Sequence, residues 1–147
     1  MEAGLFEVLV ADVQSLLREF GGHKGQPTAV CLESRTLQST TESGARAGYD
    51  GAKRRKGSKV HIAVDTLGHL MALKVTPADQ GDRAQVAALA EEVQLVTGNT
   101  VDLAYVDQGY TGQAAREAAA EYGIRIESLS MTTTPANRLS YSILAKH

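Results

Sequence analysis

The chain has 147 residues, of which 43% are hydrophobic, and a formal net charge of −2 at pH 7. These values predict one globular domain with a hydrophobic core, and they exclude a protein whose overall positive charge draws it to nucleic acid or membranes. The single cysteine, Cys31, excludes an internal disulfide framework, and no apolar run reaches the ~20 residues that span a bilayer. We therefore expect a cytoplasmic protein with no membrane partner.

The first part of the chain predicts a helix, a short strand and a long loop. Apolar residues recur at helical spacing over residues 3–20, namely Leu5, Leu9, Val13, Leu16, Leu17 and Phe20. The run TAVCL, residues 28–32, predicts a strand that ends at Glu33. Residues 38–58 are rich in Gly, Ser and Thr and predict a loop; one of this length in a compact domain is usually functional or disordered.

A β-hairpin is predicted over residues 59–76, where apolar residues alternate along both strands. In the first strand Val60, Ile62 and Val64 alternate with His61, Ala63 and Asp65, and in the second strand Met71, Leu73 and Val75 share one face. We interpret His61 and Asp65 as residues that face solvent rather than as support for a site.

The remaining sequence predicts two helices and two further strands. Asp82 and Gln85 have the spacing of a capping box at the start of a helix that Gly98 ends. A nearly continuous apolar strand follows and ends at Asp107, as expected of a strand covered on both faces. Thr111 is expected to cap an alanine-rich helix, and residues 124–127 predict a last short strand.

This order of elements predicts an α/β fold with a mixed sheet. The hairpin makes the first three strands antiparallel, and the strand–helix–strand units that follow favour parallel pairing. The order is that of the ribonuclease-H-like fold, in which the first and fourth strands lie side by side. A nucleotide- or phosphate-binding protein of flavodoxin-like design is a less favoured alternative, because such folds place helices between most strands.

Two carboxylates stand at the predicted ends of these neighbouring strands. If the strands are parallel, Glu33 and Asp107 emerge at one edge of the sheet, where adjacent strands are about 4.8 Å apart. Two carboxylates so placed suit Mg²⁺, which keeps waters and substrate phosphates as its other ligands. The alternative is that Asp107 only starts a turn and Glu33 is a solvated strand end.

Three stretches of the sequence resemble the DDE transposases of bacterial insertion sequences, in particular the families numbered four and five. They are CLESRTLQST at 31–40, KRRKGSKVHIAVDTLGHLMALKVTPADQGDRAQV at 53–86 and YVDQGYTG at 105–112. The resemblance runs from about residue 3 to residue 127. It implies a ribonuclease-H-like core, Mg²⁺ or Mn²⁺ as cofactor, and cleavage and strand transfer of DNA at the ends of an insertion sequence.

The same resemblance implies that Glu33 and Asp107 are catalytic and bind metal. Asp107 matches the family's acid after the fourth strand, whereas Glu33 stands where the family has Asp. The third family acid is a Glu on a later helix, and this sequence has no Asp or Glu after Glu127. We therefore expect a truncated, inactive transposase, or alternatively a non-catalytic DNA-binding or interaction remnant of the same fold.

Three parts are expected along the chain: a remnant of an N-terminal helical region over residues 1–27, the catalytic core over 28–127, and an irregular tail over 128–147. The concentrated basic patch consists of Lys53, Arg54, Arg55, Lys56 and Lys59. We expect it to bind DNA phosphates without reading sequence; the alternative is a solvated basic loop. The resemblance also implies association with the bacterial nucleoid, and we expect a homodimer.

Overall fold

The computed structural model describes residues 3–40, 44 and 47–129. The expected irregular tail over residues 128–147 therefore lies almost entirely outside the described residues. In chain order the elements are α1 (Ala3–Phe20), β1 (Ala29–Gln38), β2 (Gly48–Asp50), β3 (Arg55–Asp65), β4 (Leu70–Pro77), the 3-10 turn η2 (Asp82–Gln85), α2 (Val86–Thr97), β5 (Leu103–Val106), the 3-10 turn η3 (Gln108–Tyr110), α3 (Gln113–Ala120) and β6 (Arg125–Ser128).

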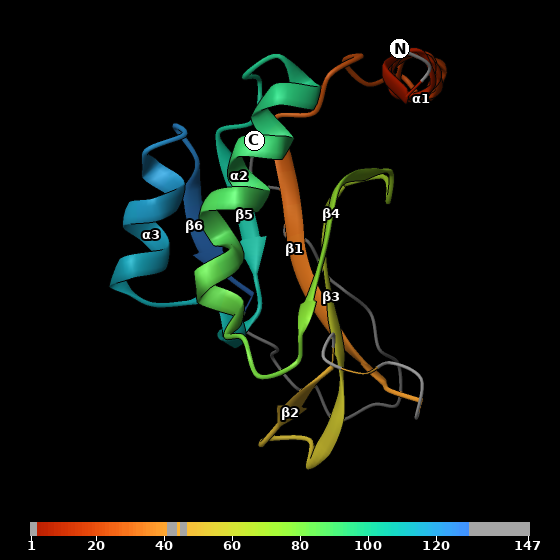
Figure 1. Ribbon diagram of the computed structural model, residues 1–147. Helices are drawn as coiled ribbons and strands as arrows, with labels where there is room; N and C mark the ends of the chain where they lie inside the picture. The colour runs from red at the N-terminus through yellow and green to blue at the C-terminus, as the bar shows by residue number, and fades with distance from the viewer. Residues whose placement is uncertain (1–2, 41–43, 45–46, 130–147) are drawn as a thin grey trace, which may run out of the picture.

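The strands form one mixed sheet in the order β2-β3-β1-β5-β6, and β4 pairs with β3 beside β2 (Figure 1). β3 pairs antiparallel with β1, β2 and β4, whereas β1 pairs parallel with β5 and β5 pairs parallel with β6. This is the predicted ribonuclease-H-like mixed sheet. The strands predicted as first and fourth are β1 and β5, and they lie side by side. The prediction holds because the hairpin is too short for a crossover, whereas α2 and α3 are long enough to return the chain in parallel.

The main hydrophobic core lies between the sheet and the pair of helices α2 and α3, which cover the same face of it (Figure 1). Buried members from the two central strands include Val30, Leu32, Ala104 and Val106. Leu89 is one of the α2 side chains that pack against them. The described residues contain no helix that is both long and apolar enough to cross a membrane.

The region predicted as a long loop is partly a β-hairpin, so that prediction was wrong over much of its length. β2 pairs with the first residues of β3, and Arg54 in the turn between them has a left-handed backbone with φ of 50°. The Asp50 side chain accepts hydrogen bonds from the N–H groups of Ala52 and Lys53 and from the Thr36 hydroxyl. These bonds close the turn and tie it to β1, and this long-range contact cannot be seen in the local composition.

Both predicted helix caps were wrong. Asp82 lies in a 3-10 turn, and α2 begins only at Val86 with no side-chain cap. The Asp82 carboxylate instead forms an ion pair with Lys59 of β3. Thr111 donates its hydroxyl hydrogen to the Gln108 carbonyl, so it closes η3 rather than capping α3.

His61 and Asp65 of β3 are buried, so the interpretation that they face solvent was wrong. His61 and Asp65 are 0% and 2% exposed, while Leu73 and Val75 on β4 are exposed. The row that faces the core is therefore small or polar. It tolerates this burial because both polar side chains have hydrogen-bond partners, as buried polar groups require.

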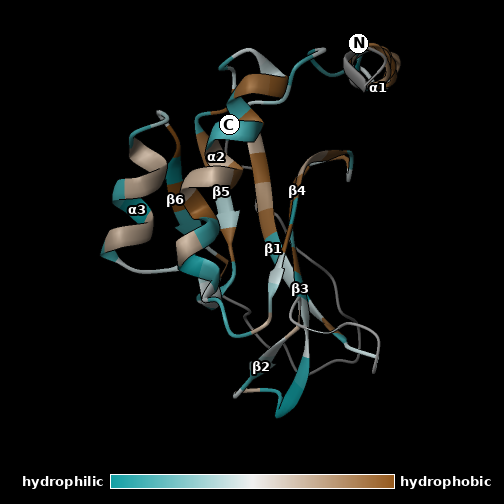
Figure 2. Cartoon of the chain, in the orientation of Figure 1, coloured by the Kyte–Doolittle hydropathy of each residue, from teal (hydrophilic) through white to brown (hydrophobic). Residues whose placement is uncertain are grey.

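Helix α1 forms as predicted, but its apolar residues remain exposed in the described structure; Phe20, for example, is 88% exposed. Figure 2 shows the hydrophobic colouring of this helix, which lies apart from α2 and α3. Gln14 and Arg18 connect it to the sheet: Gln14 donates to the Leu70 carbonyl, and Arg18 forms a buried ion pair with Asp65.

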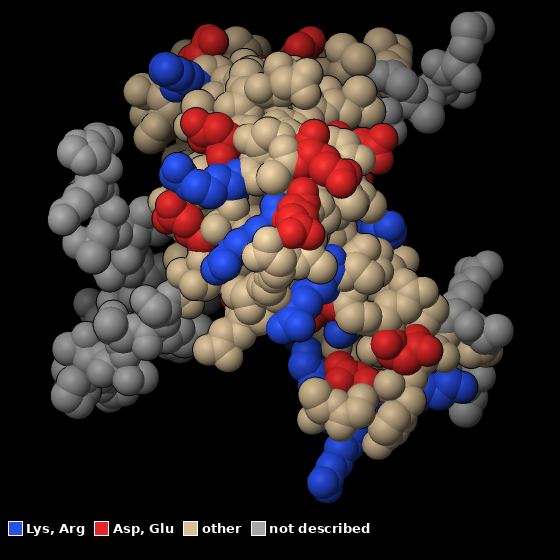
Figure 3. All heavy atoms as spheres, turned by 90° about the vertical axis from the view of Figure 1, so that its left-hand side faces the viewer, with Lys and Arg blue, Asp and Glu red and all other residues tan. Residues whose placement is uncertain are grey.

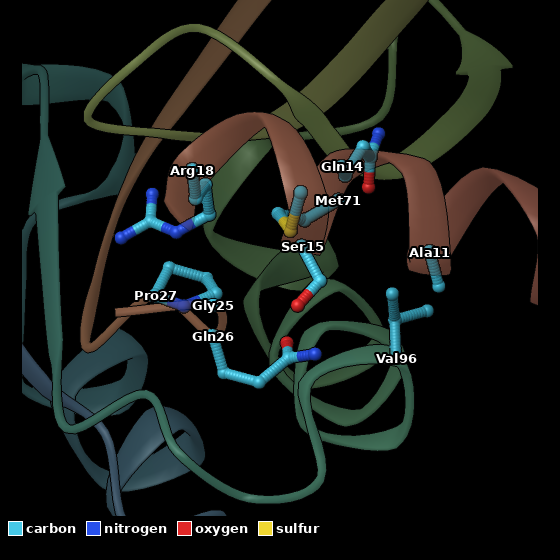
Figure 4. A pocket seen from close by; sticks show the side chains of 9 residues that line it. All are labelled: Ala11, Gln14, Ser15, Arg18, Gly25, Gln26, Pro27, Met71 and Val96. Atoms are coloured by element: carbon cyan, nitrogen blue, oxygen red, sulfur yellow. The ribbon is translucent and has the colours of Figure 1, made fainter. Parts of the chain in front are cut away.

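A small crevice lies where α1 meets the rest of the chain (Figure 4). Its lining residues come from the helix, from the connection to β1, and from β4 and α2: Ala11, Gln14, Ser15, Arg18, Gly25, Gln26, Pro27, Met71 and Val96. Arg18 also donates to the Lys24 carbonyl, so one buried guanidinium holds both the helix and the connection that follows it.

Replacing Asp65 with Ala should lower the free energy of unfolding by about 3–5 kcal/mol, because Arg18 would keep a buried charge without its partner. Urea denaturation measures this change. Asp12→Asn, at an exposed carboxylate of α1, is the control and should shift the value by less than about 0.5 kcal/mol. Equal effects of the two substitutions would show that the buried pair does not anchor α1.

Candidate active site

The register of β1 and β5 brings the two predicted site residues together. The parallel ladder between these strands ends with Leu32 opposite Val106. Glu33 is the next residue on β1, Asp107 directly follows the end of β5, and both are exposed. The expectation that β1 ends at Glu33 was wrong, because β1 continues to Gln38 against β3; Glu33 instead marks where β1 no longer has β5 as its neighbour.

Asp107 also has a structural role at the start of η3. Its Oδ1 accepts a hydrogen bond of 2.9 Å from the Gly109 N–H, so it caps the turn. The alternative interpretation, that Asp107 starts a turn, is therefore correct as far as it goes. It does not exclude metal binding, because a carboxylate has two oxygens with about four lone-pair sites.

Tyr110, at the end of η3, is a buried residue of this region that the sequence analysis did not identify. Its hydroxyl donates to the Glu33 carbonyl over 3.0 Å and lies 2.8 Å from His61 Nδ1. His61 Nε2 lies 3.0 Å from the Thr76 hydroxyl. The only signal in the sequence was a tyrosine just after the predicted strand end, which by itself does not distinguish a core residue from a site residue.

The protonation of His61 follows from its surroundings. Burial lowers the pKa of His61 below its usual value, and it outweighs the nearby Asp82 carboxylate, which raises that pKa. Lys59 and Lys74 lower it further. Burial also raises the pKa of the Tyr110 hydroxyl, with Asp82 as the next contribution. Both groups are therefore neutral near pH 7.

Asp82 lies against the turn that follows Asp107. A side chain at Gly109 would place its Cβ 2.6 Å from Asp82 Oδ2 and 3.1 Å from Asp107 Oδ1. A side chain at position 109 would therefore displace the Asp82 carboxylate from the turn. Asp82 Oδ1 is 3.2 Å from Lys59 Nζ and 3.6 Å from His61 Nδ1, so a cation partly compensates its charge beside the site.

The donor chemistry of this edge fits a divalent cation only in part. Glu33 and Asp107 provide carboxylate oxygens, which Mg²⁺ and Mn²⁺ prefer as ligands. Among the residues that the structure describes, however, no group of three or more His, Cys, Asp or Glu side chains is arranged to hold a metal ion. The described chain therefore supplies an incomplete ligand set.

The predicted basic patch is divided between two environments. Lys53, Arg54, Arg55 and Lys56 are exposed on the β2–β3 turn and the start of β3. Figure 3 shows Lys and Arg side chains reaching the projecting end of the molecule, where Figure 1 places this hairpin. Lys59 lies instead beside Asp82, with only 12% of its side chain exposed, and contacts the Gln80 carbonyl.

Acidification should destabilise the chain through His61. Because its folded-state pKa is lowered, the unfolded chain binds the proton more readily, so this contribution is complete above about pH 6.5 and is lost as pH falls through the folded pKa. Urea denaturation between about pH 7.5 and pH 5.5 should show this loss. His61→Gln should flatten the dependence, whereas His23→Gln at an exposed site should retain it; equal slopes would contradict this assignment.

Comparison with known proteins places the chain in a family. A crystal structure of the Mos1 strand transfer complex is similar with 13% sequence identity and a TM-score of 0.42, covering 82% of this chain and 40% of that chain. The chain thus spans less than half the length of that solved chain, and a comparison with curated proteins finds no match. The family model for the transposase DDE domain matches residues 24–141, well over half of the sequence. The chain therefore belongs to the family of transposase DDE domains.

Proposed function

We propose that this chain is the catalytic-core portion of a DNA transposase, in which Glu33 and Asp107 bind a divalent cation, Mg²⁺ or Mn²⁺. The observation that supports it best is the β1–β5 register, because the exposed residues Glu33 and Asp107 each directly follow the last pair of the ladder. Membership in the transposase DDE-domain family supports the proposal that this pair does more than form a turn. A bound cation would stabilise the negative charge that develops at a phosphodiester during its cleavage.

The 147-residue chain by itself is proposed to be a weak metal binder that leaves DNA uncut. Glu33 has one methylene more than the Asp expected in the family, which moves its carboxylate by about 1.5 Å, and errors near 1 Å in such sites cost about 100-fold in rate. The sequence has no acid after Glu127 to serve as a third ligand. In a two-metal site, the ions stabilise the attacking and the leaving oxygen of an in-line displacement at a phosphodiester. This chemistry requires protein ligands that hold both ions.

A non-catalytic DNA-binding role is the second candidate function. The incomplete ligand set among the described residues favours it, because the exposed basic side chains need no metal to contact phosphates. We propose that Lys53, Arg54, Arg55 and Lys56 are the main contacts. Lys59, the fifth residue of the predicted patch, contributes less, because releasing it leaves Asp82 without its ion pair.

The partners are proposed to be the DNA ends of an insertion sequence. A homodimer and an association with the nucleoid stay predictions. Within the described residues, the exposed apolar side chains of α1 are a surface that suits a protein contact of this kind.

The metal proposal is tested by titrating the 147-residue chain with Mn²⁺ and following free Mn²⁺ by electron paramagnetic resonance. We expect weak, saturable binding that Asp107→Asn and Glu33→Gln each weaken by at least about tenfold, since even residues that only support a ligand have effects of that size. Asp102→Asn, an exposed acid just before β5, is the matched control and should bind like the unaltered chain.

Cleavage of a supercoiled plasmid that carries the element's ends tests the chemistry. The unaltered chain and Glu33→Asp should both leave the plasmid intact, because the third acid is still missing. Restoring that Asp together with a C-terminal segment that bears the family Glu should restore metal-dependent cleavage. Robust cleavage by the unaltered chain that Asp107→Ala abolishes would show that the proposed inactivity is wrong.

Exchanging Lys53, Arg54, Arg55 and Lys56 for Ala should weaken DNA binding uniformly across sequences. The slope of log affinity against log salt should become shallower by up to about 3.6, at about 0.9 for each phosphate that is no longer neutralised. Fluorescence anisotropy at several salt concentrations measures both quantities. A variant with Ala at Lys24, Arg83, Arg116 and Arg125 makes the same charge change at other positions, and an equal loss of affinity there would exclude a specific hairpin contact.

A further inference from the structure

The Tyr110 hydroxyl joins the two segments that carry the candidate metal ligands. Tyr110 follows Asp107 by three positions, and its hydroxyl donates to the Glu33 carbonyl over 3.0 Å, across 77 residues of sequence. This bond forms where β1 no longer has β5 as its neighbour, because the ladder stops at Leu32 and Val106. The hydroxyl therefore provides a partner for a main-chain carbonyl at the point where the two strands separate.

The tyrosine is itself held in place from the other side. Its side chain is fully buried, and its hydroxyl lies 2.8 Å from Nδ1 of His61, whose ring meets the Tyr110 ring edge-on at 82°. His61 Nε2 lies 3.0 Å from the Thr76 hydroxyl on β4. Side chains from β3 and β4 thus fix the position of η3 relative to β1.

The hydrogen bonds that link Thr76, His61, Tyr110 and Glu33 can all be formed at once with a single assignment of donors and acceptors. Because the Tyr110 hydroxyl donates to the Glu33 carbonyl, its oxygen is available to accept from His61 Nδ1–H. His61 Nε2 then accepts from the Thr76 hydroxyl. With the Nδ1–H tautomer assigned to a neutral His61, every donor in the series from β4 to β1 has an acceptor.

We propose that Tyr110 is a positioning residue that sets the separation of the Glu33 and Asp107 carboxylates, with His61 and Thr76 holding its hydroxyl in place. This inference rests on the proposed function, because it gives the tyrosine a role toward the metal that these carboxylates bind. Asp107 and Tyr110 belong to one short turn, closed by the Asp107–Gly109 hydrogen bond. A shift of Tyr110 therefore moves Asp107 relative to Glu33.

Tyr110→Phe is the test, because it removes one hydroxyl and retains the buried ring. Thr97→Val is the matched control: it also removes a buried hydroxyl, which in α2 bonds to the Val93 carbonyl. Two measurements are made on both variants and on the unaltered chain. Hydrogen exchange at the backbone amides of positions 109 and 110 reports on the turn without metal, and Mn²⁺ titration reports on the carboxylates.

We expect Tyr110→Phe to speed exchange of the two turn amides and to weaken Mn²⁺ binding by about five- to tenfold each, which corresponds to the loss of about one hydrogen bond. Thr97→Val should change neither, although both variants lose some global stability. Unchanged exchange and unchanged Mn²⁺ affinity in Tyr110→Phe would overturn the proposal, as would equal changes in Thr97→Val.

The same two measurements distinguish a failure of the proposed metal site from a failure of the positioning role of Tyr110. If the unaltered chain shows no saturable Mn²⁺ binding, the metal site falls, and the exchange measurement alone decides whether Tyr110 holds the turn to β1. Faster exchange confined to the turn in Tyr110→Phe would then support the positioning role, and exchange equal to that of the unaltered chain would overturn it.

Discussion

The parallel pairing of β1 with β5 is the constraint on which the arrangement of this chain depends. It joins the antiparallel part of the sheet, built on β3, to the parallel part that ends with β6. It also buries Val30, Leu32, Ala104 and Val106 in one row beneath the helices. Because paired residues in neighbouring strands share a face, the last pair determines which residues stand beside each other at the edge. The positions of Glu33 and Asp107, each directly after the last pair of the ladder, are therefore a consequence of core packing.

Buried polar side chains on β3 connect the sheet to elements outside it. Asp65 binds Arg18 and thereby α1, while its other contacts close the turn to His69. Burial alone raises the pKa of Asp65, but hydrogen bonds from the His69 N–H and the Arg18 guanidinium lower it overall. His61 connects to Tyr110 and Thr76 in the same way. Such groups are expensive to bury and tolerate few alternative arrangements, so they specify how these segments dock.

The basic hairpin and the carboxylate edge are connected through β1. Thr36, on the part of β1 beyond Glu33, bonds to Asp50 and to Lys53, and so fixes the base of the basic turn. Backbone N–H groups of the turn and the Thr36 hydroxyl lower the pKa of Asp50, which keeps it ionised as their acceptor. The extension of β1 beyond β5 thus carries both the carbonyl that accepts from Tyr110 and the support for the exposed cations.

Local sequence patterns were enough to define most of the elements, their order and the strand pairing. Apolar periodicity located α1, the hairpin and α2, and the short hairpin and the two longer helical connections left one favoured topology. That topology was sufficient to predict that β1 and β5 pair in parallel. Contacts between distant residues set the rest: the length of β1, which β3 supports beyond β5, and the buried positions of His61 and Asp65. They also moved Asp82 from a helix cap to Lys59 and placed Tyr110 against Glu33, because side-chain contacts across the sheet outweigh local preferences that are each about 1 kcal/mol.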